Sequence, residues 1–85
     1  MQKDLMYEEY WLVNSNRSKV KRFHKNRQNK DKFFEYIFID SGKISGIFGK
    51  QPPVMTIREE LKIKKAREEW KKLLAHGWRR TKVVW

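Results

Sequence analysis

The 85-residue sequence contains no cysteine, only two prolines and four glycines, and no long run of apolar residues. The absence of cysteine excludes a disulfide framework, a thiolate metal site and cysteine catalysis, and it is typical of a reducing compartment. A membrane-spanning helix needs about 20 mostly apolar residues, and no segment meets that requirement. The opening segment also lacks the apolar stretch of a signal peptide, so we expect a cytoplasmic protein.

The chain is long enough for one small domain over residues 1–85, in which residues 1–8 are expected to be disordered. A protein of this length buries only roughly 60–65% of the surface of its unfolded chain. Aromatic residues make up 14% of the sequence, and large rings bury much area per residue. We therefore expect a small core that depends on its aromatic side chains.

Positive charge dominates the sequence, with a net charge of +11, and it is concentrated in residues 17–32. Such a dense basic block is often an arm that binds nucleic acid, although it can also be a solvated surface that keeps the protein soluble. The candidate phosphate contacts are Arg17, Lys19, Lys21, Arg22, Lys25, Arg27, Lys30 and Lys32, with Arg79 and Arg80 near the C-terminus.

Three segments near the N-terminus have the apolar alternation of β-strands: residues 9–15, 18–24 and 33–40. The intervening polar segments predict turns, so the three strands should form an antiparallel meander. Residues 17–32 then form a basic strand and loop. Residues 41–53 contain three glycines and both prolines, which predicts a loop.

The C-terminal third predicts a helix over residues 57–76, followed by a terminal strand over residues 78–85. Thr56 and Glu59 fit a capping box at the start of the helix. Ile57 and Leu61 lie nearly opposite the apolar stripe of the helix, which indicates that its first turn is separate. The fold class expected is α+β, with a small antiparallel sheet of three to five strands and one C-terminal amphipathic helix on one face.

The segment FFEYIFID, residues 33–40, is apolar on both faces. We expect the helix to pack on Phe33, Ile37 and Ile39, with Trp11 and Val13 beside them. The alternate positions would form the opposite face: Phe34, Tyr36 and Phe38. Three roles for that face stay open: it is covered by the loop after the strand, it is a partner or self-association interface, or it is a platform on which bases stack.

The segment from Ala66 to Arg80 has the pattern A-x-x-x-W-x-x-L-x-x-x-G-W-R, and W-L-V-N stands near the start of the chain. This combination resembles a family of short, uncharacterised proteins of marine picocyanobacteria. The matching positions are Trp11, Leu12, Val13, Asn14, Ala66, Trp70, Leu73, Gly77, Trp78 and Trp85. The resemblance implies a single α+β domain and a cyanobacterial or cyanophage origin. The family has no established activity, so the resemblance implies no catalytic residue.

Catalytic and cofactor sites have little support in the sequence. The two histidines, His24 and His76, lie on different predicted elements with no carboxylate at motif spacing. GIFGK is followed by Gln-Pro and not by the Ser or Thr of a phosphate-binding loop. We therefore expect no catalytic residue, no metal site, no cofactor and no small-molecule substrate.

The sequence thus predicts a small, basic, non-enzymatic accessory protein that binds RNA or DNA mainly through phosphate contacts. A second hypothesis is an adaptor that docks on an acidic protein surface through Phe34, Tyr36 and Phe38, with the basic block steering association. A third is a homodimer built through the same face.

Overall fold

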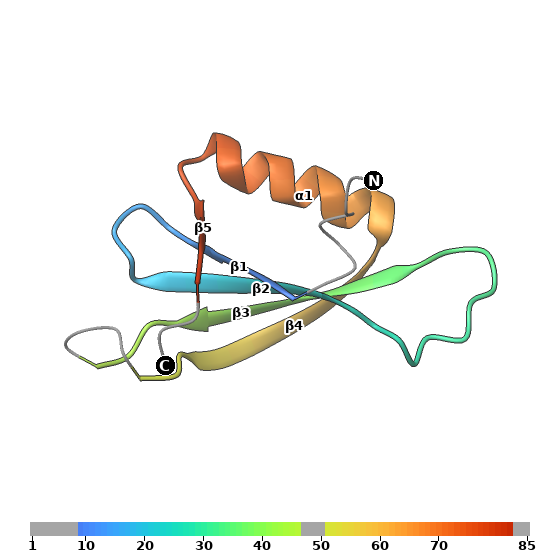
Figure 1. Ribbon diagram of the computed structural model, residues 1–85, viewed down its shortest axis with the longest axis horizontal. Coiled ribbons are helices and arrows are strands. Elements are labelled where there is room, and N and C mark those ends of the chain that lie inside the picture. The colour runs from blue at the N-terminus through green and yellow to red at the C-terminus, as the bar shows by residue number, and fades with distance from the viewer. Residues whose placement is uncertain (1–8, 47–50, 83–85) are drawn as a thin grey trace.

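The computed structural model describes residues 9–46 and 51–82 (Figure 1). Its elements in chain order are β1 (Tyr10–Val13), β2 (Lys19–Lys25), β3 (Tyr36–Lys43), β4 (Val54–Lys62), α1 (Ile63–Ala75) and β5 (Arg79–Thr81). The five strands form one antiparallel sheet in the order β4-β3-β2-β1-β5, and α1 lies across one face (Figure 1). The predicted fold class is confirmed.

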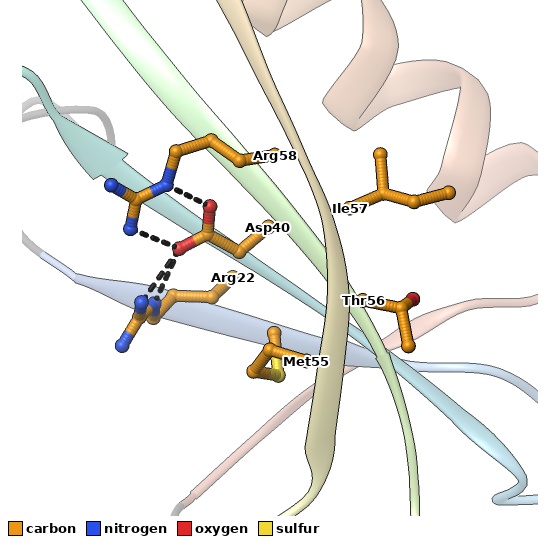
Figure 2. Close-up of a pocket in the computed structure, with 6 residues that line it drawn as sticks. All are labelled: Arg22, Asp40, Met55, Thr56, Ile57 and Arg58. Atoms are coloured by element: carbon orange, nitrogen blue, oxygen red, sulfur yellow. Dashed lines mark hydrogen bonds and ion pairs between the residues drawn. The ribbon is translucent and has the colours of Figure 1, made fainter.

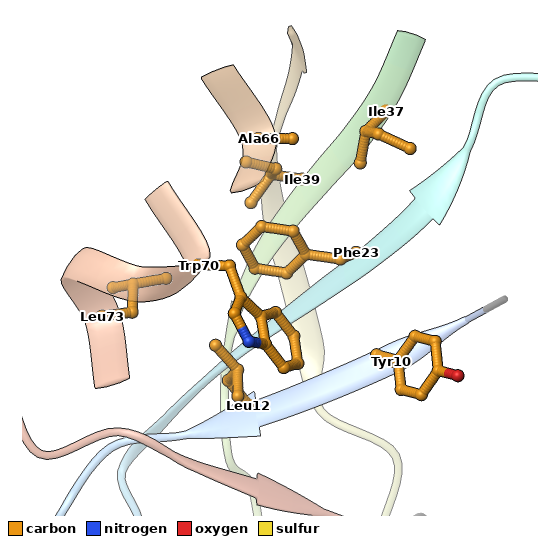
Figure 3. Close-up of a cluster of buried hydrophobic side chains, with 8 residues drawn as sticks. All are labelled: Tyr10, Leu12, Phe23, Ile37, Ile39, Ala66, Trp70 and Leu73. Atoms are coloured by element: carbon orange, nitrogen blue, oxygen red, sulfur yellow. The ribbon is translucent and has the colours of Figure 1, made fainter. Parts of the chain in front are cut away.

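The main core lies between α1 and the sheet (Figure 3). Trp70 of the helix is at its centre, with its ring edge-on to Phe23 at 5.1 Å and to Tyr10 at 6.2 Å between centroids. Edge-to-face contacts of this kind add stability beyond the area they bury. The other buried members of this cluster are Leu12, Ile37, Ile39, Ala66 and Leu73. Thus the apolar stripe of the helix is confirmed as a core stripe.

The predicted start of the helix at residue 57 is wrong, because residues 54–62 form strand β4. Helix α1 begins at Ile63, and Lys62 precedes it without a side-chain capping bond, so the Thr56–Glu59 capping box does not form. Ile57 and Leu61 do not fit the helical stripe, whereas in β4 they lie opposite Ser41 and Ile37 of β3. In a helix Leu61 would lie opposite the core stripe, whereas in β4 it packs against the main core.

The predicted loop over residues 41–53 begins later than expected, because β3 continues to Lys43. The β3–β4 pairing has a register shift between Ser41 and Gly42. A Cβ atom at Gly42 would lie 2.7 Å from the carbonyl oxygen of Val54, so only glycine allows this close approach of the two strands.

The faces of β1 are reversed relative to the prediction. Tyr10 pairs with Phe23 and points with it toward the helix, whereas Trp11 and Val13 lie on the opposite face. There they form a second buried cluster with Val20, against which Ile44 and Met55 pack. The alternation within the strand was predicted, but which face joins the core depends on the register with β2.

The expected terminal strand over residues 78–85 corresponds to the shorter β5, while residues 83–85, including Trp85, lie outside the described residues. The expectation of disorder in residues 1–8 also lies outside them, as do residues 47–50 of the loop. Within the described ranges, no helix combines the length and the apolar character needed to cross a membrane.

Candidate nucleic-acid interface

The face of the sheet opposite the helix carries a cluster of charges centred on Asp40 of β3, which is only 3% exposed (Figure 2). Its two cross-strand neighbours are both arginines, Arg22 on β2 and Arg58 on β4. Arg58 donates from Nε to Oδ1 at 2.6 Å and from Nη2 to Oδ2 at 3.0 Å. Arg22 donates to Oδ2 from Nη2 at 2.6 Å and from Nε at 3.1 Å. Nε2 of His24 lies 2.8 Å from the same oxygen.

These contacts fix the protonation state of Asp40. Burial alone would raise the pKa of its carboxyl, but the hydrogen bonds from Arg58, Arg22 and His24 outweigh burial and hold the pKa well below its ordinary value. A carboxylate with so low a pKa and with both oxygens engaged is poorly suited to act as a general base. An open pocket of about 220 Å³ beside the cluster is lined by Arg22, Asp40, Met55, Thr56, Ile57 and Arg58.

Aromatic rings on and beside this face are covered by cations of the chain itself. The guanidinium of Arg58 lies 4.3 Å from the ring centroid of Phe38, and the ammonium of Lys62 lies 4.2 Å from that of Phe34. The ring of His24 also lies against Phe38, at 5.4 Å between centroids. A cation–π contact at these distances occupies one face of each ring, so that face is not free to stack on a base.

Phe34, Tyr36 and Phe38, which were expected to form one partner face, do not all belong to the same strand. Tyr36 and Phe38 belong to β3, while Phe34 precedes it and is 54% exposed. Ile44 belongs to the loop that was expected to cover this face, but it packs against the second buried cluster of Trp11, Val13 and Val20. In the described residues, the region around Phe38 is thus covered chiefly by Arg58 and His24.

The segment that joins β2 and β3, residues 26–35, is termed here the hairpin loop, and it extends beyond the helix at one end of the sheet (Figure 1). Asp31 organises its second half. Oδ1 accepts hydrogen bonds from the backbone N–H groups of Phe33 (2.8 Å) and Phe34 (3.1 Å), and Oδ2 accepts one from the Tyr36 hydroxyl (2.8 Å). The bonds from the Phe33 N–H and the Tyr36 hydroxyl are the main causes that lower the pKa of Asp31.

Two asparagines attach the hairpin loop to the neighbouring strand. Asn26 and Asn29 both donate from their side-chain amides to Glu60 of β4. Within the loop, the Asn26 side chain also accepts from the backbone N–H of Gln28 and that of Asn29 accepts from Asp31. The loop therefore has a defined conformation without a hydrophobic core of its own.

The structure separates the ten predicted phosphate contacts into two groups. Three have partners within the sheet or the hairpin loop: Arg22 binds Asp40, Lys21 donates to the Ser41 hydroxyl at 2.8 Å, and Lys25 pairs with Glu35 at 3.1 Å. The other seven are exposed: Arg17, Lys19, Arg27, Lys30, Lys32, Arg79 and Arg80.

The exposed seven do not form one patch. Arg17 and Lys19 lie at the β1–β2 turn, where Arg17 has a positive φ of 57°, while Arg27, Lys30 and Lys32 lie on the hairpin loop at the far end of β2. The two arginines of β5 contact the chain itself. Arg79 donates to the backbone oxygens of residues 74 and 78, and Arg80 lies 4.5 Å from the ring centroid of Tyr10. The hairpin loop is therefore the strongest remaining candidate.

Sequence reasoning missed a further set of cations beside the hairpin loop. The backbone N–H of Ile63, where α1 begins, donates to the carbonyl oxygen of Glu35 at 2.9 Å. This bond places Lys62 and the first turn of the helix, with Lys64 and Lys65 and no acidic residue, next to the loop. Cations at a helix N-terminus are electrostatically unfavourable, so positive potential accumulates at this end. The misfit of Ile57 and Leu61 to the helical stripe was the signal for the later helix start.

The described residues contain no group of three or more His, Cys, Asp or Glu side chains that could hold a metal ion. His76 is engaged in the end of the helix, where its Nδ1 donates to the carbonyl oxygen of Lys72 at 2.7 Å.

A family model described as "Protein of unknown function (DUF1651)" matches residues 9–85. The chain belongs to this family. Comparison with curated proteins and with solved structures found no match. The description of DUF1651 assigns no activity, so the function has to be argued from the geometry of the chain itself.

Proposed function

We propose that this protein is a non-enzymatic, cytoplasmic accessory protein that binds nucleic acid through phosphate contacts centred on the hairpin loop. The observation that carries the proposal is the arrangement of charge in this loop. Arg27, Lys30 and Lys32 are exposed, whereas the acidic residues Asp31 and Glu35 are engaged in contacts within the hairpin. The positive groups therefore remain available to an incoming polyanion.

The neighbouring elements strengthen the positive potential of this end. Lys62, Lys64 and Lys65 stand where the helix begins, and the positive end of the helix dipole points the same way. Phosphate contacts from lysine and arginine supply affinity and strong salt dependence but carry little sequence information. We therefore infer binding with low sequence specificity.

The remaining exposed cations serve as secondary contacts in this proposal. Lys19 and Lys25 are the first and last residues of the seven-residue strand β2, so the β1–β2 turn lies about 20 Å from the hairpin loop. A strand of nucleic acid that reaches Arg17 and Lys19 as well as the loop must span that distance. We expect longer oligonucleotides to bind more tightly for this reason.

The test is the salt dependence of binding to a fluorescently labelled oligonucleotide, measured by anisotropy from roughly 50 to 200 mM salt. The triple variant Arg27→Gln/Lys30→Gln/Lys32→Gln should bind more weakly, and the slope of log Kd against log salt should fall by about 2 for a single strand. A matched control with the same charge, Arg67→Gln/Lys71→Gln/Lys72→Gln, removes exposed cations of the helix instead. It should change the slope much less. Equal effects, or no binding by the wild type at low salt, would contradict the proposal.

Docking on an acidic protein surface is a weaker proposal. Lys62 and Arg58 each cover one face of the rings of Phe34 and Phe38, which reduces the apolar surface that an anchor in a protein interface would need. Self-association has one supporting feature, since β4 is an edge strand with Val54 and Ile57 exposed. The four charged residues of β4, which are Arg58, Glu59, Glu60 and Lys62, oppose such edge pairing.

We also infer, from the pattern between Ala66 and Arg80 and the W-L-V-N segment, that the protein comes from marine picocyanobacteria or their phages. Recovery of the same motif set in the genomes of these organisms is the direct test. Absence of the motif set from them would contradict the inference.

A further inference from the structure

Phe33 is the most exposed large apolar residue in the described part of the chain, at 89% of its surface. It was predicted to lie in the core beneath the helix, but β3 begins only at Tyr36 and Phe33 remains in the hairpin loop. Its neighbour Phe34 is less exposed and lies beneath the ammonium group of Lys62. The ring of Phe33 is therefore the most accessible aromatic surface of the loop.

The backbone that carries this ring is held in place. The N–H of Phe33 donates to Asp31 Oδ1, and Asp31 is bound at the same time by the N–H of Phe34 and the hydroxyl of Tyr36. Asn26 and Asn29 attach the first half of the loop to Glu60. A single exposed phenylalanine needs no explanation in itself, but a ring carried by an ordered loop can bind a ligand without the entropic cost of ordering the backbone.

Three exposed cations, Arg27, Lys30 and Lys32, share this loop with Phe33. Proteins hold unpaired nucleotides by combining an exposed ring, on which the base stacks, with cations that bind the phosphates of the nucleic acid. In a duplex the faces of the bases are already stacked on one another, so the ring would first have to separate base pairs.

We propose that the hairpin loop selects single-stranded over double-stranded nucleic acid by stacking an unpaired base on Phe33. This inference rests on the proposed function, because the phosphate contacts of that function bring the strand to the loop. Stacking on Phe33 adds affinity that a duplex of the same charge does not receive. The preference concerns strand state and not base identity, since every base has a face that can stack.

An anionic membrane has the same charge complementarity to the loop but fits its apolar surface less well. Phe33 offers one exposed ring, and the adjacent Phe34 is about half exposed with one face beneath the ammonium group of Lys62. Interfacial anchoring scales with the apolar area buried, and one exposed ring with part of a second supplies little of it. Unpaired nucleic acid is therefore the occupant that the loop fits best, and vesicles provide the comparison in the test.

The experiment measures Kd by anisotropy at one low salt concentration for three labelled ligands of equal length: a single strand, its duplex and a single strand with abasic sites. The variants are Phe33→Ala, Phe33→Tyr and the control Val54→Ala. Val54 is also exposed and apolar, but it lies at the end of β4 remote from the hairpin loop. Binding to phosphatidylserine-containing vesicles is measured in parallel by co-sedimentation.

Phe33→Ala should weaken binding to the intact single strand by at least about fivefold, the lower end of what one stacked base contributes. Phe33→Tyr and Val54→Ala should bind like the wild type. The abasic strand should bind the wild type as weakly as the intact strand binds Phe33→Ala, and Phe33→Ala should not weaken it further.

Unchanged single-strand binding by Phe33→Ala would overturn the inference, as would an equal loss for the duplex. Vesicle binding that requires Phe33, together with oligonucleotide binding that does not, would also overturn it in favour of a membrane surface. In each of these cases the proposed function stands if the triple glutamine variant of the loop still lowers the salt slope. The proposed function fails separately if the triple glutamine variant and its matched control change the salt slope equally.

Discussion

Asp40 and Arg58 lie directly opposite each other on β3 and β4 and form a two-point ion pair, with 2.6 Å between Nε and Oδ1 and 3.0 Å between Nη2 and Oδ2. Arg22 approaches the same carboxylate from β2, on the other side of β3. One buried charge thus connects three adjacent strands on the face that the helix does not cover. A fork-shaped guanidinium is suited to this geometry, whereas lysine cannot reproduce both bonds.

We expect Asp40→Asn to destabilise the protein strongly, because two guanidinium groups would then face a neutral amide. Removing one partner of a buried ion pair costs about 3–5 kcal/mol in other proteins, and the half-exposed position of Arg58 favours the low end of this range. A loss of about 3 kcal/mol would lower the Tm of so small a domain by on the order of 15 °C. Thermal unfolding followed by circular dichroism measures this shift.

The control for this variant is Glu59→Gln, which makes the same change of charge at an exposed position on β4. It should alter the Tm by only a few degrees, as exposed charges contribute little. Equal shifts for the two variants would mean that the ion cluster does not stabilise the fold.

The lowered pKa of Asp40 predicts acid sensitivity. Its carboxylate is stabilised in the folded state relative to the unfolded chain, so the contribution is fully present above the ordinary carboxyl pKa and is lost as the pH falls toward the folded value. The free energy of unfolding should therefore decrease from about pH 5 downward. Urea unfolding at a series of pH values measures it, and Asp40→Asn should show a flatter profile. Parallel profiles for the two proteins would assign the acid sensitivity to other carboxyl groups.

Asp31→Ala should loosen the hairpin loop without unfolding the domain, since the variant removes the acceptor for two backbone N–H groups and the Tyr36 hydroxyl. We expect hydrogen exchange at the amides of Phe33 and Phe34, followed by NMR, to become about tenfold faster.

Asp31→Asn is the matched control for this loop variant, because it removes the same charge but keeps an oxygen that can accept the two N–H groups. It should retain most of the protection of these amides. If both variants exchange at the wild-type rate, the loop does not depend on Asp31 for its order.

Much of the architecture could be predicted because it follows from local patterns. The stripe that includes Ala66, Trp70 and Leu73 identified the core face of the helix, and alternation identified the first three strands. The boundary at residue 63 was missed, since the Arg and Glu residues between Ile57 and Leu61 favour a helix locally while pairing with β3 makes the segment a strand. Here the tertiary partner outweighs the local preference.

The site was harder to predict than the fold. The basic block was evident, but which of its cations pair within the chain and which stay exposed depends on partners distant in the sequence. Asp40 stood at the end of an expected strand, and its arginine partners lie 18 residues before and after it. Phe33 continued the alternation of β3 and was therefore assigned to the core, although the strand begins three residues later. Alternation alone does not show where a strand ends.

The Asp40 cluster also defines which residues of the three strands lie opposite one another. A slip by two residues would keep every side chain on its own face, so the hydrophobic core alone discriminates weakly against it. Thr56 and Glu60 lie two positions before and after Arg58 in β4. Val20 and His24 lie two positions before and after Arg22 in β2. Any such slip of β4 would put a hydroxyl or a second carboxylate opposite the buried Asp40. The cluster therefore supplies the alignment of the strands as well as their cohesion.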